Sequence, residues 1–174
     1  MALASHVSVV PNHITGRTVP LKFRFDVAMS AKLGMDLQPK DMTPEEKEFS
    51  KNAIKEYYGI REIVQHGDLY RLLSPYENER TAMMYVSEDK KDAVVFTYLL
   101  EKVINGGNNQ VLYLKGLDPN KRYRLNELNK APNTYSWFTP LEGKSYTGAY
   151  LMEYGLRFPM YNQFESKIIR LTEE

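Results

Sequence analysis

The sequence predicts an α+β chain dominated by β structure, in which a helical first half precedes an antiparallel β-sandwich. Residues 20–67 contain two stretches with apolar side chains three or four residues apart, the spacing of one helix face. From Asp68 onward, short runs suited to strands alternate with turn sequences. Aromatic residues make up 12% of the chain and are enriched in strands. We place the boundary between the two halves at residues 67 and 68.

The chain opens with a short strand-like run over residues 3–10, followed by a loop over residues 11–17. No partner strand is predicted near this run. A strand without a partner leaves its backbone N–H and C=O groups unpaired. We therefore expect this part to have been cut from a larger structure, in which neighbouring strands complete it.

The first helix is expected to begin at Pro20, because proline is well tolerated at a first helical position. An apolar face follows, and Gly34 is the expected stop, since glycine accepts the left-handed conformation that ends many helices. The apolar face consists of Leu21, Phe25, Ala28 and Met29.

The second helix has the strongest local signal in the sequence. Thr43 and Glu46 form a capping-box pattern, and Pro44 stands between them at the first helical position. Gly67 is expected to end the helix. The helix presents one apolar stripe that must pack on something, made by Phe49, Ala53, Tyr57, Ile60 and Val64.

The second half contains several short strand candidates bounded by turns, the pattern of an antiparallel sandwich. Residues 88–92 form a charged, hairpin-like connection, and residues 116–120 form a turn with Gly, Asp, Pro and Asn. The candidate strands are residues 82–87, 93–100, 110–114, 122–125, 145–150 and 164–171.

Composition excludes several classes of function. A formal net charge of +1 gives no electrostatic reason to expect nucleic acid or a membrane as a partner. The chain has no cysteine, which excludes disulfides, thiolate zinc sites and a cysteine nucleophile, and which fits a cytoplasmic location. No signal peptide, membrane-spanning run or glycine-rich phosphate loop is recognised, so we expect no cofactor.

Few residues suggest chemistry of their own. His6 and His13 lie seven positions apart, on a strand and a loop, and Ser8 follows His6 closely. Spacing alone does not define a catalytic triad, and a metal site needs a further ligand, for which only the distant His66 remains. The acidic residues of the second helix are typical of a solvated face. We therefore predict no catalytic residue and no metal site.

One segment resembles a known family. Residues 6–17 read H-V-S-V-V-P-N-H-I-T-G-R, similar to a segment near the end of the catalytic barrel of family 36 glycoside hydrolases, the bacterial-type α-galactosidases. Residues 26–37 resemble the next helix of that barrel and its exit, where Met35 and Asp36 replace a common aromatic residue and glutamate. Residues 57–73 resemble the last long helix and the entry into the C-terminal domain. Weaker similarity to the β-sandwich of that domain covers residues 116–119, 148–156 and 164–169.

The resemblance implies that residues 1–67 are the last strand and helices of a (β/α)8 barrel and that residues 68–174 are a C-terminal β-sandwich. The parent would hydrolyse terminal α-galactosides, such as melibiose or raffinose, with retention. In that family the catalytic aspartates lie upstream of the segment found here. The isolated chain is therefore expected to be inactive, with the rest of the barrel as its partner. At most His6, Asn12 and His13 would line or support the substrate pocket.

Three alternatives remain open at this point. The sandwich can be a carbohydrate-binding module, with its densest aromatic cluster at Tyr135, Trp137 and Phe138, or these residues can anchor a loop. It can serve as an oligomerisation domain. The chain can also be an independent enzyme built around its histidines. Because exposed apolar faces are rare on monomers, we expect the two helices either to fold onto the β domain or to drive homo-oligomer formation.

Overall fold

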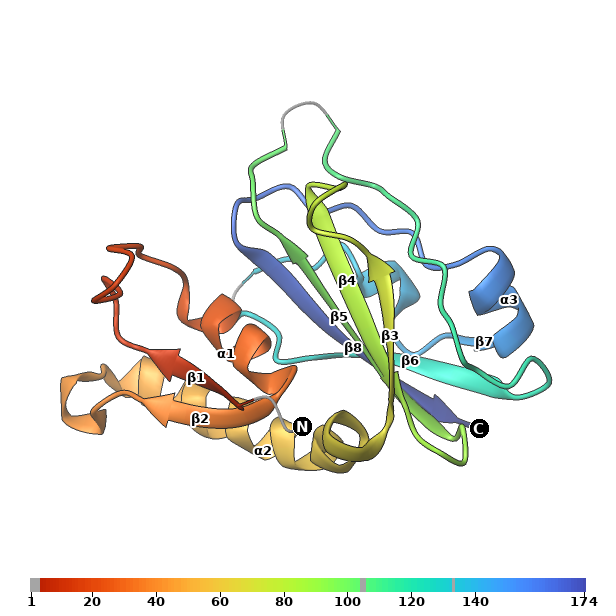
Figure 1. The fold of residues 1–174 in the computed structure, drawn as a ribbon, viewed down its shortest axis with the longest axis horizontal. Helices are drawn as coiled ribbons and strands as arrows, with labels where there is room; N and C mark the ends of the chain where they lie inside the picture. Colours follow the sequence, from red (N-terminus) through yellow and green to blue (C-terminus); the bar gives the residue numbers. More distant parts are fainter. Residues whose placement is uncertain (1–3, 104–105, 133) are drawn as a thin grey trace.

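The computed structural model describes residues 4–103, 106–132 and 134–174 (Figure 1). The first half contains β1 (Ala4–Ser8), α1 (Leu21–Met29), β2 (Lys32–Asp36), a short 3-10 helix (Pro39–Asp41) and α2 (Pro44–His66). The second half contains β3 (Asp68–Leu73), β4 (Arg80–Val86), β5 (Asp92–Leu99), β6 (Arg122–Leu128), a 3-10 helix (Thr139–Leu141), β7 (Ser145–Thr147), α3 (Gly148–Glu153) and β8 (Glu165–Glu173).

The first half is a β-α-β-α unit, and here the structure corrects two predictions. The expected lone strand has a partner, because β1 pairs in parallel with β2, from Ala4 opposite Lys32 to Ser8 opposite Asp36. A parallel pair needs a crossover, and α1 supplies it. Gly34 lies inside β2 and does not end α1, which closes at Ser30 through bonds to the last carbonyls of the helix. The unit thus contains two strands of a parallel sheet.

Helix α2 forms as its sequence predicts. The Thr43 hydroxyl accepts the Glu46 N–H at 3.2 Å, and the Glu46 carboxylate accepts the Thr43 N–H at 3.0 Å, which completes the capping box. Gly67 follows the last helical residue and donates its N–H to the carbonyl of Ile63. These bonds satisfy backbone groups that every helix end leaves without partners.

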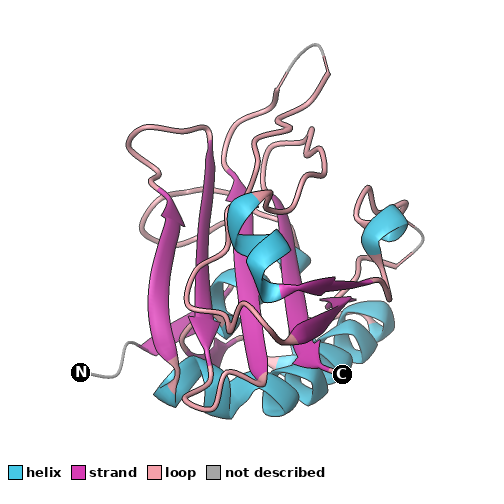
Figure 2. Cartoon of the chain, turned by 90° about the vertical axis from the view of Figure 1, so that its right-hand side faces the viewer, coloured by secondary structure: helices cyan, strands magenta, loops and turns pink. Residues whose placement is uncertain are grey.

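The second half is built on one six-stranded antiparallel sheet with the order β3-β4-β5-β8-β6-β7 (Figure 2). The predicted strands at residues 82–87, 93–100, 122–125 and 164–171 correspond to β4, β5, β6 and β8. The charged segment at residues 88–92 joins β4 and β5 as a hairpin. The last strand of the chain, β8, lies between β5 and β6, so the sheet is completed by its C-terminal segment.

Two local predictions in this half fail, and one strand is found that was not predicted. Residues 145–150 form only the short strand β7, because the Thr147 hydroxyl accepts the Tyr150 N–H and starts α3. Residues 110–114 form no strand and only an isolated bridge between Leu112 and Leu156. Strand β3 was not predicted; it directly follows α2 and pairs with β4.

Both faces of the sheet are covered, which confirms the antiparallel, layered β class. Helices α1 and α2 pack on one face, where side chains of β5 and β8 such as Phe96, Tyr98 and Ile168 are buried. The other face is covered by α3 and by irregular segments that contribute Leu112, Phe138 and Phe158 among others. The apolar stripes of the two helices therefore find their cover on the β domain, one of the two expected outcomes.

A buried arginine ties the irregular layer to the sheet. Arg80 of β4 is fully buried, and its guanidinium lies 4.3 Å from the centre of the Phe158 ring. It donates to the Phe158 carbonyl at 3.1 Å, the Gln110 carbonyl at 3.3 Å and the Thr97 hydroxyl at 2.9 Å. Burial lowers the pKa of Arg80 to about 9, so it remains a cation at neutral pH. One side chain thus links β4 to two segments that form no strand of the sheet, those at Gln110 and Phe158.

A polar cluster joins α1 to the β domain. Asp26 of α1 is fully buried and accepts from Lys22 Nζ at 2.5 Å and from Asn129 Nδ2 at 2.6 Å. The Tyr98 hydroxyl of β5 donates to the Asp26 carbonyl at 3.0 Å. The Asn129 N–H donates to the Glu56 carboxylate of α2. Burial raises the pKa of Glu56, and the negative charge of Asp26 raises it further, against the bond from Asn129.

Replacing Asp26 with alanine is expected to lower the free energy of unfolding by about 3 kcal/mol, since Lys22 and Asn129 would lose their buried partner. Urea unfolding followed by Trp137 fluorescence measures this change. Glu48→Ala, on the exposed face of α2, is the matched control and should change stability by less than about 0.5 kcal/mol. Equal effects of the two substitutions would contradict a structural role for Asp26.

Candidate functional site

The carboxyl ends of β1 and β2 form the candidate site. Because the two strands are parallel, Ser8 lies opposite Asp36, and the next segments of the chain, residues 9–20 and 37–43, leave at the same end of the pair (Figure 1). In barrels built from such units, loops at this end carry the active site. The predicted residues Asn12 and His13 lie in the first of these two segments.

Asn12 organises its own loop. Its side-chain oxygen accepts the N–H groups of Ile14 and Thr15, each at 3.0 Å, and the Thr15 hydroxyl at 3.2 Å. Its amide nitrogen donates to the Ser8 hydroxyl at 3.3 Å. Asparagine favours such local turns because its short side chain reaches nearby backbone N–H groups. Asn12 therefore holds the shape of the loop.

His6 lies on β1 itself, outside the loop. It is exposed and stands opposite Gly34 of β2. A Cβ atom on Gly34 would lie only 2.8 Å from His6 Cδ2, so the absence of a side chain there makes room for the imidazole. His6 and Asn12 border the same shallow cavity of about 180 Å³. His13 is exposed and does not line this cavity, so the structure brings together only two of the three predicted residues.

Arg24 is a site residue that the sequence patterns did not indicate. Its guanidinium donates to the Ser8 carbonyl at the end of β1 and to the Val19 carbonyl at 3.1 Å. It borders the cavity near Asn12 and a second one between the two loops. Burial lowers the pKa of Arg24, and the nearby charge of Glu46 opposes this. Arg24 lies three residues after Leu21, and therefore on nearly the same face of the helix. This spacing was the available sequence signal for its position.

This end of the unit offers several groups that can bind a polar ligand. The amide of Asn12, the imidazole of His6 and the guanidinium of Arg24 offer hydrogen bonds to a polar ligand. Within the described ranges, no three His, Asp or Glu side chains lie close enough together to hold a metal ion. None of the helices in the described part of the chain is both long and apolar enough to cross a bilayer.

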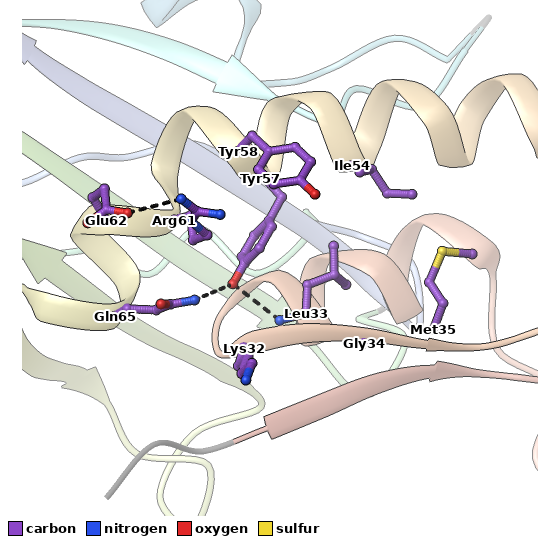
Figure 3. A pocket seen from close by; sticks show the side chains of 10 residues that line it. All are labelled: Lys32, Leu33, Gly34, Met35, Ile54, Tyr57, Tyr58, Arg61, Glu62 and Gln65. Carbon is purple, nitrogen blue, oxygen red and sulfur yellow. Dashed lines mark hydrogen bonds and ion pairs between the residues drawn. The ribbon is translucent and has the colours of Figure 1, made fainter.

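A different cavity, of about 410 Å³, lies between β2 and α2 (Figure 3). The Tyr57 hydroxyl accepts the Leu33 N–H at 3.2 Å and the Gln65 amide at 3.1 Å, and it donates to the Ala31 carbonyl at 3.1 Å. Its hydrogen-bonding capacity is therefore used within the chain. Tyr57 serves as a partner for the backbone of β2, and we assign this cavity no chemistry.

The predicted aromatic cluster is divided by the fold. Phe138 is fully buried and packs edge-to-face on Phe158, with ring centres 5.3 Å apart. Trp137 is 45% exposed and touches Tyr135 and Tyr161, at 5.1 and 5.3 Å between ring centres. Phe138 is thus a loop anchor, whereas Trp137 and Tyr135 border a cavity of about 450 Å³.

Comparisons with known proteins agree over both halves. A Melibiase family model matches residues 1–67, and the model of the glycosyl hydrolase family 36 C-terminal domain matches residues 80–171. Alpha-galactosidase AgaA of Geobacillus stearothermophilus is 41% identical over 129 residues, which are 73% of this chain and 17% of that protein. Alpha-galactosidase C of Emericella nidulans is 36% identical over 99% of this chain and 21% of its own length.

Solved structures give the same result. The GH36 α-galactosidase AgaB from Geobacillus stearothermophilus superposes with a TM-score of 0.84 and 36% identity, over 97% of this chain and 21% of that one. A variant of AgaA in complex with raffinose superposes with a TM-score of 0.85 and 35% identity, over 98% of this chain and 22% of that one. The chain thus spans about a fifth of the length of the relatives it matches.

Replacing Asn12 with alanine is expected to release the loop, since the N–H groups of Ile14 and Thr15 lose their acceptor. Their amide hydrogen exchange should accelerate by about tenfold, the equivalent of one hydrogen bond of roughly 1.4 kcal/mol. Asn12→Asp keeps a side-chain acceptor and is the matched control, with slow exchange retained. Unchanged exchange in the alanine variant would show that the loop is held by other contacts.

Proposed function

The chain belongs to glycosyl hydrolase family 36, and from this membership we propose that it works as the C-terminal part of an α-galactosidase. The substrates proposed for the whole enzyme are terminal α-galactosides of the melibiose and raffinose type, cleaved with retention. The observation that carries the proposal is the continuous similarity to α-galactosidases across both halves of the chain. A relative solved with bound raffinose supports the substrate class.

Residues 1–67 are proposed to be part of the catalytic barrel, and residues 68–174 a separate C-terminal domain. The parallel β1–β2 pair with its helical crossover is the repeating unit of such a barrel. Parallel sheets of only two strands are unusual, because their strands are normally buried within larger sheets. The rest of the barrel is therefore the proposed partner of β1 and β2.

The proposed role of the C-terminal domain is to brace the barrel. Its sheet covers the apolar faces of α1 and α2, and residues of both halves share one core that includes Phe25, Ile60 and Phe96. The helices of a barrel form its outer ring, so a sheet packed on them supports the barrel from outside. We further propose that the enzyme is homo-oligomeric and that it works in the cytoplasm. The absence of cysteine supports the cytoplasmic location.

His6, Asn12 and His13 are proposed to lie at the rim or in the support of the substrate pocket. The position of Asn12 and His13 after the carboxyl end of β1, and of His6 beside the same cavity as Asn12, supports this role. No catalytic group is assigned to this chain. The nucleophile and the acid/base are proposed to come from other strands of the barrel, as the family resemblance implies.

The 174-residue chain alone is expected to show no turnover of 4-nitrophenyl α-galactoside above the buffer rate. The reason is that hydrolysis with retention needs two carboxyl groups held across the scissile bond, which we place outside this chain. Release of nitrophenol, measured by absorbance, tests this. Turnover that survives repeated purification would instead favour an independent enzyme.

In the whole enzyme, replacing His13 with alanine is expected to lower kcat/KM for raffinose by roughly tenfold, the effect of one lost hydrogen bond at a pocket rim. Tyr76→Ala is the control, since Tyr76 is 96% exposed in the connection between β3 and β4. Steady-state kinetics of the two variants measure the difference. An unchanged kcat/KM for the His13 variant would remove this residue from the pocket.

A further inference from the structure

A groove on the β domain lies outside the site described above. The start of α1, residues 130–131 and 134–139, and the segment leading into β8 enclose a cavity of about 450 Å³. This volume falls within the range of roughly 300–1,000 Å³ that is usual for small-molecule sites. The groove includes Trp137, Tyr135 and Phe164 among its lining residues, so it presents aromatic surface to a ligand.

Trp137 is the aromatic residue best placed to meet a ligand. It is 45% exposed, although indole rings are large and are usually buried for most of their area. Tyr135 and Tyr161 pack against it, with ring centres at 5.1 and 5.3 Å, and fix its orientation. An indole that is held in place but uncovered offers a preformed surface at little entropic cost.

The floor of the groove is polar and buried. Lys167 Nζ lies 3.2 Å from Glu127 Oε1 and donates to the Ser136 hydroxyl at 2.9 Å, and the side chains of Lys167 and Glu127 are 5% and 2% exposed. Ser166, the preceding residue of β8, is 2% exposed and also lines the groove, and its side chain leaves the strand on the face opposite to Lys167. Its hydroxyl has no hydrogen-bond partner among the described residues. A buried hydroxyl without a partner is uncommon and indicates a missing one.

The charges that border the groove are compensated. Lys167 faces Glu127, Lys22 lies 2.5 Å from the Asp26 carboxylate, and Lys130 lies 3.1 Å from Glu142. An anion such as phosphate would therefore find no free cation among the described residues that line the groove. The groove fits a ligand that is neutral, rich in hydroxyl groups and apolar on one face.

We infer that this groove binds neutral carbohydrate, with a pyranose ring stacked on Trp137 and its hydroxyl groups directed to the polar floor. A pyranose has a face of C–H groups that packs on an aromatic ring. Its hydroxyl groups both donate and accept hydrogen bonds, which matches the polar side chains that line the groove. The aromatic wall of the groove comes from the β domain, and the start of α1 lines its other side.

The single tryptophan of the chain makes the test direct. Trp137 fluorescence of the unaltered chain is followed during titration with raffinose, melibiose and maltose, and acrylamide quenching is measured at each step. We expect a saturable spectral shift and protection of Trp137 from acrylamide by at least one sugar at millimolar concentration. Inorganic phosphate is titrated in parallel and should have no effect. Catalytic turnover is not involved, so the result is independent of the proposed function.

Calorimetry with two variants locates the site. Trp137→Ala is expected to weaken sugar binding by about tenfold, the worth of one stacked ring. Tyr154→Ala is the matched control, because Tyr154 is 67% exposed on the surface after α3 and outside the groove, and it should bind as the unaltered chain does. The inference is overturned by an absence of saturable binding up to about 50 mM sugar, by equal binding of the Trp137 variant, or by phosphate binding in place of sugar.

Discussion

The joint between the two halves depends on a buried carboxylate, that of Asp26 on α1. A buried charge is strongly destabilising unless it is paired and hydrogen-bonded; Lys22 of the same helix pairs with Asp26, and α1 can dock only where Asn129 also reaches it. Apolar contacts alone would tolerate some rotation of α1 on the sheet, because they have no direction. The polar bonds fix that rotation. They thereby fix the position of β1, whose loop carries Asn12, relative to the β domain.

Local patterns predicted local structure well. The capping box of Thr43 and Glu46 defined the start of α2, because its bonds join residues only three positions apart. The β4–β5 hairpin was equally visible. The β1–β2 pair was missed because parallel partners are separated by a whole crossover, and because β2 is too short to show a clear alternation. Arg80 contacts segments 30 and 78 residues away, so nothing near it in sequence indicates the layer that it holds.

The candidate site was predicted in part, for the same reason. The H-V-S…P-N-H segment indicated which loop to examine, and the structure does bring His6 and Asn12 to one cavity. It did not indicate that Asn12 uses its side-chain oxygen to hold its own loop, nor that Arg24 reaches back from α1 to the end of β1. Both facts depend on where the chain turns after Val10. Residue type alone does not distinguish a polar group that holds a loop from one that awaits a ligand.

Hydrogen-bond satisfaction supplies that distinction across the chain. Tyr57 donates one hydrogen bond and accepts two within the protein, so its hydroxyl offers nothing further to a ligand. The cavity beside it nevertheless has a volume close to that of the aromatic groove. In the groove, Trp137 is 45% exposed, and the Ser166 hydroxyl has no partner among the described residues. Folding normally satisfies buried polar groups. A buried polar group without a partner, close to an exposed aromatic ring, is therefore a better indicator of a ligand site than the volume of a cavity. The β domain covers α1 and α2 with one face and presents the groove at its margin, where Phe23 and Phe164 belong both to the shared core and to the groove lining.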